Sequence, residues 1–340
     1  MRPLLAALAL LAACSDPEIA LTNATSLICP KPGALPFRMM SSGYRTSINR
    51  TIATDGPRVK DEASDTIGNP GGKIASVYLA DDQAPSAGPV DYRGAKARTA
   101  LENGAAATPL EGENVSLWYF ADTGWTSLGR SKTDANGTYD VPDTGLVAPN
   151  GAPVYAMLEA DGSCAEHFNY LFPAGSKVVV TDIDGTLTHD DGELLLQLGD
   201  VTHVPKMMGA ADKLLQAWAA KGYPIVYLTA RPHKYRVESR GWLEGIGFPA
   251  GPLITQNGGK TADVYKTLWM QRMIQTFGWN VVAAYGNADT DITAYENAGI
   301  AKNQTFIVGD LPDPRGAVAI PNFDFTQHIA SYVATQPANH

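Results

Sequence analysis

Two aspartates separated by one residue follow an apolar, β-branched run in the middle of the chain. Asp182 and Asp184 lie in Asp-Ile-Asp-Gly-Thr, directly after residues 177–181. Because alternate residues of an extended chain point the same way, both carboxylates can face one site before Gly185 turns the backbone. Two carboxylates this close repel each other, and a hard cation such as Mg²⁺ relieves that repulsion. One carboxylate can then attack phosphorus to give an aspartyl-phosphate, while the other protonates the leaving oxygen.

Three later segments carry the other groups that phosphoryl transfer needs. The hydroxyl of Thr229, in Leu-Thr-Ala-Arg at a predicted strand end, can hold a phosphate oxygen. The ammonium of Lys266 can offset negative charge on the transferring group, and Lys260 is its rival for this role. Asp291, in Gly-Asn-Ala-Asp-Thr-Asp, offers a further carboxylate for the metal, with Asp289 as its rival. The predicted Mg²⁺ ligands are Asp182, Asp184 and Asp291.

These residues meet only if the elements around them form a parallel sheet. From residue 177 onward, apolar runs typical of buried strands alternate with helical patterns, such as the i, i+3, i+4, i+7 spacing of apolar residues from Ala211 to Trp218. The predicted strands cover 177–181, 223–229, 252–255, 279–285 and 304–308. The alternation predicts an α/β fold with a doubly wound parallel sheet, in which ligands bind outside the carboxyl ends of the strands.

Over about residues 176–310 the motifs resemble those of the haloacid dehalogenase superfamily of phosphatases. The resemblance implies that Asp182 is the nucleophile and Asp184 the general acid and base. It also implies that Thr229 and Lys266 are the second and third motifs and that Asp291 is the metal-binding fourth motif. The superfamily's dehalogenases lack the second aspartate, so its presence here indicates phosphate chemistry.

A closer similarity is to the lipin family of phosphatidate phosphatases and to the LNS2 domains of phosphatidylinositol-transfer proteins. The similar stretches, in the same order, are 182–188, 202–203, 230–231, 240–243, 251–253, 266, 286–287, 291–292 and 294–295. The resemblance implies Mg²⁺-dependent hydrolysis of phosphatidic acid to diacylglycerol and phosphate. The predicted phosphate or substrate contacts are Gly185, Thr186, Ala230, Arg231 and Asn287.

The first motif is followed by only a short segment, about 193–208, before the next helix. We therefore expect no large cap over the site, which leaves it open to a bulky or surface-held substrate. A basic rim suited to a lipid phosphate is one interpretation of the nearby cations, and a solvated helix face is the other. These cations are Arg231, His233, Lys234, Arg236 and Arg240. Two other functions stay open: hydrolysis of soluble phosphomonoesters, and phosphatidate binding without turnover.

The first residues have the pattern of a signal peptide. A basic Arg2 precedes an apolar run from Leu4 to Ala13, which is too short to span about 30 Å of hydrocarbon. The run ends in Leu-Ala-Ala-Cys, which resembles the lipobox of bacterial lipoproteins. This implies a signal peptide at 1–13, acylation of Cys14, and a lipid-anchored protein at the periplasmic face of the bacterial cell envelope, with Ser15 favouring the outer membrane. A plain signal peptide is the alternative.

Length, charge and the distribution of chain breakers predict how the rest of the chain is organised. Its 340 residues suit two domains, and a net charge of -9 argues against a nucleic-acid partner. Residues 14–72 contain many chain breakers and predict a tether, and 174–340 form the phosphatase domain. Between them, 73–173 predict a small immunoglobulin-like β-sandwich, with a hairpin at Asn136-Gly137 between strands at 127–133 and 138–141. Cys29 and Cys164 could form a disulfide outside the cytoplasm or remain free thiols.

Overall fold

The computed structural model of the chain describes residues 59–61, 66–68, 73–75, 86–87, 92–99, 108–109, 112, 114–121, 124–135, 138–141, 148–158, 164–200, 202–232, 235–256 and 260–339. The predicted signal peptide, Cys14 and Cys29 lie outside these ranges, as does the side chain of Cys164, so the anchor and the disulfide stay predictions. None of the helices within the described ranges combines the length and the apolar character that crossing a bilayer requires.

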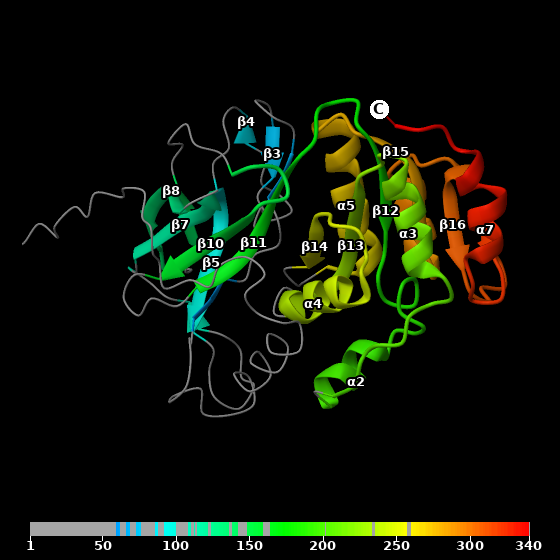
Figure 1. Cartoon of the computed structure of the whole chain (residues 1–340), viewed down its shortest axis with the longest axis horizontal. Coiled ribbons are helices and arrows are strands. Elements are labelled where there is room, and N and C mark those ends of the chain that lie inside the picture. Colours follow the sequence, from blue (N-terminus) through cyan, green and yellow to red (C-terminus); the bar gives the residue numbers. More distant parts are fainter. Residues whose placement is uncertain are drawn as a thin grey trace, which may run out of the picture.

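A parallel sheet forms the centre of the C-terminal part (Figure 1). Its strands, in chain order, are β12 (Lys177–Thr181), β13 (Ile225–Pro232), β14 (Leu253–Gln256), β15 (Asn280–Gly286), β16 (Thr305–Val308) and β17 (Val318–Ile320). Their order in the sheet is β14-β13-β12-β15-β16-β17, and every neighbouring pair is parallel. The predicted α/β class is therefore confirmed. The edge strand β17 was not predicted, because three residues are too few for a pattern.

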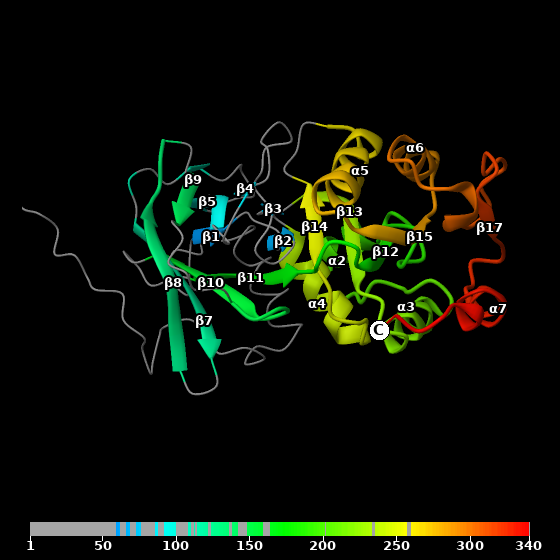
Figure 2. The same cartoon turned by 90° about the horizontal axis from the view of Figure 1, so that it is seen from above.

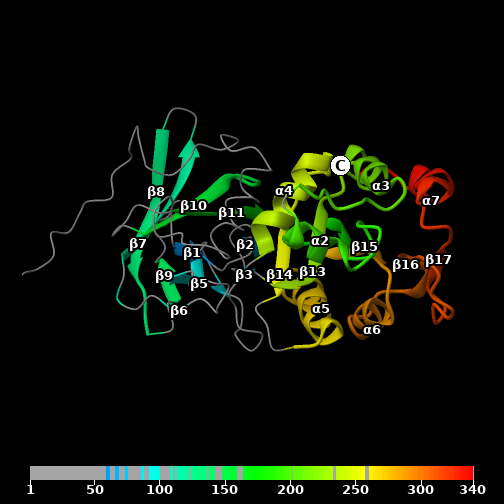
Figure 3. The ribbon, with the colours of Figure 1, turned by 90° about the horizontal axis from the view of Figure 1, so that it is seen from below.

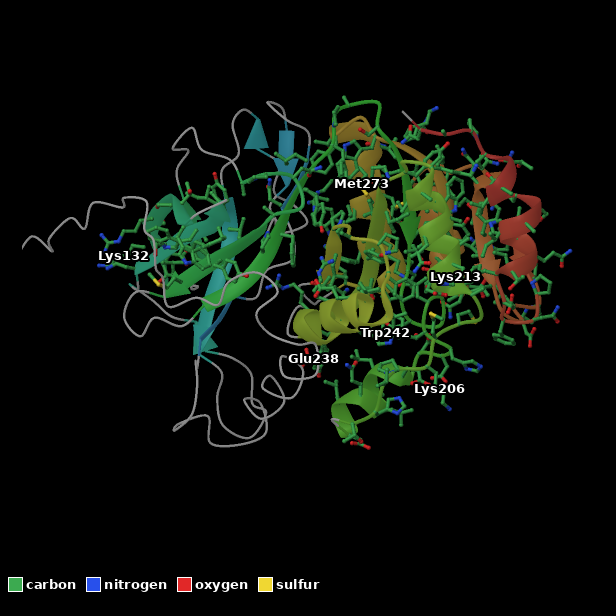
Figure 4. The ribbon with its side chains drawn as sticks, viewed as in Figure 1. Lys132, Lys206, Lys213, Glu238, Trp242 and Met273 are labelled. Atoms are coloured by element: carbon green, nitrogen blue, oxygen red, sulfur yellow. The ribbon has the colours of Figure 1, made fainter. Side chains whose placement is uncertain are left out.

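Helices cover both faces of this sheet (Figure 2). They are α2 (Glu193–Gly199), α3 (Ala211–Ala220), α4 (Arg236–Ile246), α5 (Ala262–Gln271), α6 (Asp289–Asn297) and α7 (Thr326–Ser331), and a π-helical turn, Arg272–Thr276, continues α5. Helices α5 and α6 lie on one face and α3, α4 and α7 on the other. Side chains of β12 alternate between two cores: Val179 belongs to the same buried cluster as Trp242, whereas Val178 and Val180 belong to the cluster of Met273, and Figure 4 labels Trp242 and Met273.

The segment between the first motif and α3 is a narrow excursion. Its stem is an antiparallel bridge between Thr188 and Met207, flanked by a hydrogen bond from the His189 N–H to the Lys206 carbonyl at 2.8 Å. Its described part carries the single helix α2, which lies beyond the carboxyl ends of the parallel strands (Figure 3). The buried carboxylate of Glu193 ties this helix to the returning chain. We define residues 189–206 as the α2 excursion.

Strands from the first half of the chain form two further sheets. They are β1 (Val59–Asp61), β2 (Thr66–Gly68), β3 (Lys73–Ala75), β4 (Ser86–Ala87), β5 (Tyr92–Thr99), β6 (Thr108–Pro109), β7 (Asn114–Ala121), β8 (Gly124–Lys132), β9 (Thr138–Val141), β10 (Pro153–Leu158) and β11 (Cys164–Leu171). One sheet has the order β4-β3-β2-β11-β10-β7-β8, and in the other β5 pairs with β1, β6 and β9. All these pairings are antiparallel except that of β2 with β11.

Two expectations for this half differ from the structure. The hairpin predicted at 136–137 is wrong: β8 pairs with β7, whereas β9 pairs with β5 in the other sheet and buries Tyr139 there. The tether predicted over 14–72 also ends earlier than expected, because β1 and β2 lie inside it. Strands of three residues are too short to show alternation, so the sequence did not reveal them. The immunoglobulin-like type of this part stays a prediction.

The two parts of the chain share a hydrophobic core. Ile67 of β2 and Tyr170 of β11 belong to the same buried cluster as Leu228 and Trp269 of the α/β part. The rings of Phe172 and Trp279 lie 5.2 Å apart across the same boundary. Strands β2 and β11 therefore contribute side chains to the core of the α/β part.

Replacing Ile67 should measure this shared core. Because Ile67 is fully buried, Ile67→Ala should lower the free energy of unfolding of the α/β part by about 2–4 kcal/mol. Urea unfolding followed by tryptophan fluorescence would report it, with Val318→Ala at a partly exposed site as the control. A loss below about 0.5 kcal/mol would show that the segment around Ile67 does not stabilise the α/β part.

Candidate active site

The first motif is built on the end of the central strand β12. The backbone N–H of Asp182 donates to the Tyr285 carbonyl of β15 at 3.0 Å, which fixes the motif to the neighbouring strand. The chain then turns at Gly185, whose φ is 65°. A Cβ at this position would collide with the amide of Asn287, so only glycine fits. The glycine of Asp-Gly thus serves a close approach between two motifs.

Lys266 of α5 lies between two carboxylates. Its ammonium is 3.0 Å from Asp182 Oδ1 and 2.6 Å from Asp291 Oδ1, and its side chain is 4% exposed. Asp291 Oδ2 accepts the backbone N–H groups of Asn287 and Ala288 at 3.0 and 3.1 Å. Asp291 is therefore held by one ammonium and two amides. We call Asp182, Lys266 and Asp291 the buried triad.

Burial and charge act against each other in the triad. Burial raises the pKa of Asp182 to about 7, with Lys266 opposing the shift and Asp291 and Asp184 adding to it. Burial also acts to lower the pKa of Lys266, but the charges of Asp182 and Asp291 outweigh it, so this pKa is raised. Lys266 therefore stays an ammonium at neutral pH, next to an aspartate that titrates there. Lys260, the rival, is exposed and does not join the triad.

Asp184 is held by a different cation. The Nε of Arg231 donates to both carboxylate oxygens at 3.0 and 2.9 Å, and its NH2 group donates to Oδ1 at 2.7 Å. The hydroxyl of Thr229 donates to Oδ2 at 3.3 Å. Asp184 is nevertheless 23% exposed, whereas Arg231 is buried. Arg231, predicted to contact the substrate, is thus found on the second aspartate.

The Mg²⁺ site predicted from Asp182, Asp184 and Asp291 stays a prediction, and each of these carboxylates is paired with a cation in the structure. Within the described residues, no three histidine, cysteine, aspartate or glutamate side chains converge closely enough to hold an ion. Lys266 contacts both Asp182 and Asp291, and Arg231 pairs with Asp184. Mg²⁺ is often held by one or two carboxylates with several waters. A site of that smaller kind fits Asp182, whose Oδ1 contacts Lys266, together with the amide oxygen of Asn287 beside the same loop.

Of the remaining predicted site residues, Thr186 and Ala230 lie beside the motif aspartates, whereas Asp289 does not. Thr186 lies beside the first motif, where its hydroxyl donates to Asn287 Oδ1 at 3.3 Å, and Ala230 is half-buried between Thr229 and Arg231. Asp289 is exposed on the first turn of α6, so Asp291 is the aspartate of that segment that reaches the site.

The predicted basic rim is wrong for the residues that the structure describes. Arg231, Arg236 and Arg240 are all buried, and Arg240 donates to the Gly251 carbonyl at 2.9 Å. His233 and Lys234 lie outside the described residues. Sequence reasoning also missed Ser239 of α4, which accepts a hydrogen bond from Arg231 NH1 at 3.0 Å. A single serine on a helix gives no signal of this role.

Comparison with known proteins matches the same region. Residues 179–309 match the family model described as the LNS2 domain of PITM 1-3. Protein retinal degeneration B of Drosophila melanogaster is 29% identical over 208 residues, which is 59% of this chain and 16% of that protein. Membrane-associated phosphatidylinositol transfer protein 3 of Homo sapiens is 28% identical over 206 residues, 59% of this chain and 20% of that protein. The chain thus spans at most a fifth of these relatives.

Solved structures show only distant similarity. An apo form of phosphoserine phosphatase has a TM-score of 0.34 at 13% identity and covers 46% of this chain and 98% of its own. The HAD domain of the effector protein Lem4 from Legionella pneumophila has a TM-score of 0.31 at 12% identity and covers 48% of this chain and 99% of its own.

Neutralising the first aspartate should stabilise the metal-free protein. The triad holds two carboxylates and one ammonium, so Asp182→Asn removes an excess buried negative charge. Because the pKa of Asp182 is raised from 3.8 to about 7, the folded wild type loses stability as pH rises between these values, and the variant does not. Urea unfolding in EDTA should show a gain of about 1–3 kcal/mol at pH 8 that shrinks towards pH 4. Asp310→Asn, at an exposed site, is the control, and a destabilised variant at pH 8 would contradict the prediction.

The order of the motifs and the region of the family match lead to one conclusion. The stretch that carries Asp182, Asp184, Thr229, Lys266 and Asp291 is the stretch that the family model covers. Residues 179–309 of this chain are therefore similar to the LNS2 domain of PITM 1-3, and they carry all five of these motif residues.

Proposed function

We propose that the chain is a Mg²⁺-dependent phosphomonoester hydrolase that acts through an aspartyl-phosphate on Asp182, with phosphatidic acid as its substrate. One observation carries the proposal: Asp182 lies at the carboxyl end of β12 with Lys266 at 3.0 Å, while Asp184 stands two residues further on and is partly exposed. A nucleophile, a cation for the phosphoryl group and a proton donor thus lie on one loop and the helix beside it.

Each residue has a chemical role in this reaction. A carboxylate oxygen of Asp182 attacks phosphorus, and the ammonium of Lys266 offsets negative charge that develops on the phosphoryl group. Asp184 protonates the leaving oxygen, and in the second step its carboxylate takes the proton of the attacking water. Asp291 holds Lys266 in place. A Mg²⁺ ion bound beside Asp182 would add positive charge next to the phosphate.

Several features favour a lipid substrate. The family match is to an LNS2 domain, and relatives named as phosphatidylinositol transfer proteins share it. The α2 excursion exposes Leu195 and Leu196 to 70% and 52% at the end of the sheet that carries the motifs. Apolar side chains exposed at this end of the sheet suit a substrate held in a lipid surface better than a small soluble ester, which remains the alternative.

One specific observation supports a second function, phosphatidate binding without turnover. Both motif aspartates carry a cation partner, Lys266 on Asp182 and Arg231 on Asp184, and the relatives are named for lipid transfer. Under this function the cations would bind the lipid phosphate, and the aspartates would only hold the cations. Turnover separates the two functions.

We also propose that Cys14 is acylated and that the protein acts at the periplasmic face of the cell envelope. A lipid anchor would bring it to the membrane, which its net charge of -9 cannot do at an anionic surface. The lipobox-like Leu-Ala-Ala-Cys supports this location.

A phosphate-release screen should test the proposed activity. With Mg²⁺, the protein should release phosphate from phosphatidic acid in mixed micelles faster than from soluble phosphomonoesters, and EDTA should stop the release. Asp182→Asn should lower the rate by at least about 10³-fold, because the nucleophile is lost, while leaving liposome binding within about threefold.

The outcomes distinguish the three functions. Release from soluble esters but not from phosphatidic acid would assign the soluble alternative. Binding of phosphatidic acid liposomes with no release from any ester would assign the binding module and contradict the enzyme.

Changing Cys14 should release the protein from the membrane. The full chain, expressed in a bacterium with an outer membrane, should fractionate with membranes and show acylation of Cys14 by mass spectrometry. Cys14→Ser should move it to the soluble fraction, since several acyl chains supply the attachment. Membrane association that is unchanged in Cys14→Ser would contradict the anchor.

A further inference from the structure

We propose that Arg231 is a positioning residue that orients the Asp184 carboxylate for proton transfer, with Ser239 holding Arg231 in place. This assignment deepens the proposed function and rests on it. It also departs from the expectation that Arg231 binds the substrate phosphate.

The guanidinium of Arg231 donates its hydrogen bonds to protein side chains. Its Nε and NH2 groups together grip both oxygens of Asp184 at 2.7 to 3.0 Å, which is the two-point geometry of a strong arginine–carboxylate pair. Its NH1 group donates to Ser239 Oγ at 3.0 Å. All three nitrogens are thus engaged by protein, and the side chain of Arg231 is 1% exposed.

Ser239 completes a fixed chain of contacts. Its hydroxyl accepts from Arg231 and donates to the Tyr235 carbonyl at 2.8 Å, so its proton has a defined direction. The residue is fully buried on α4. To point towards a phosphate, Arg231 would have to break these contacts and leave the Asp184 carboxylate with only Thr229.

Helix α4 is itself fastened on two sides. Arg240 donates to the Gly251 carbonyl, just before β14, and its guanidinium lies 4.7 Å from the ring centre of Phe168 of β11. On the other side, the indole N–H of Trp242, labelled in Figure 4, donates to the Pro205 carbonyl of the α2 excursion at 3.0 Å. The support behind Arg231 is therefore rigid, as orienting a reactive carboxyl group requires.

The orientation of the Asp184 carboxyl group matters most for the step in which it protonates the leaving oxygen. As Asp182 forms its bond to phosphorus, the ester P–O bond breaks and its electron pair moves to the leaving oxygen, which takes the proton of Asp184. Water then attacks phosphorus, the carboxylate of Asp184 takes its proton, and phosphate leaves as Asp182 is regenerated. An alkoxide leaving group needs the proton from Asp184, whereas p-nitrophenolate is stable without it.

Arg231→Lys provides the test, because lysine keeps the positive charge but cannot present the two-point fork. We expect kcat for an alkyl phosphate, such as glycerol phosphate, to fall at least about 10-fold, and kcat for p-nitrophenyl phosphate by less than about threefold. KM for both esters should stay within about threefold. Combined with Asp184→Asn, the Arg231 change should add no further loss on the alkyl ester, because both act on one proton transfer.

Binding of inorganic phosphate, measured by calorimetry, gives a second readout that needs no turnover. Arg231→Lys should keep its affinity for phosphate within about threefold of wild type, whereas a residue that binds phosphate through a two-point fork should lose about 10-fold or more. This arm decides the assignment even if the protein releases phosphate from no ester, so failure of the proposed function and failure of this inference can be told apart.

Matched variants exclude a merely structural effect. Ser239→Ala should cause a smaller loss of the same selective kind, and Ser239→Thr should restore it, since the hydroxyl returns. Arg315→Gln, on an exposed arginine paired with Glu296, should change neither ester. An equal fall on both esters, or a 10-fold loss of phosphate affinity, in an Arg231→Lys protein that unfolds like wild type would overturn the proposal.

Discussion

A buried ammonium between two carboxylates is the interaction on which the rest of the site depends. Lys266 lies on α5, Asp291 lies on α6 and Asp182 directly follows β12, and charges at this depth are stable only when they are paired and hydrogen-bonded. The contact between Lys266 and Asp291 therefore requires α5 and α6 to pack side by side on one face of the sheet. Folding brings the triad together, and the triad in turn limits how far these elements can move.

The two aspartates of the first motif are prepared differently although one residue separates them. Burial of Asp182 raises the cost of its charge, and Lys266, which opposes this effect, is the cation that a transferring phosphoryl group requires. Asp184 remains partly exposed and is gripped from behind by Arg231. Distinct surroundings for two identical groups are the usual way in which a protein assigns them different roles.

The N-terminal strands take part in this arrangement from a distance. Ile67 and Tyr170 close the core beneath α5, and Phe168 lies against Arg240 of α4. Helix α5 carries Lys266 and α4 carries Ser239, so the sheet that precedes the α/β part supports both helices that position the charged residues. These N-terminal strands are therefore part of the scaffold that holds the site.

The sequence by itself determined the parallel α/β class, the end of β12 at Thr181, and the presence of Asp182, Thr229 and Lys266 at one place, because alternation and strand-end motifs are local patterns. Only the tertiary structure decided the partners of the charges. The three aspartates of the motifs suggest a metal site in the sequence. In the structure, Lys266 of α5 forms ion pairs with two of them, and Arg231 forms an ion pair with the third, Asp184. Which cation reaches which carboxylate depends on side chains from distant segments meeting in a medium of low dielectric, and no spacing along the chain encodes that meeting.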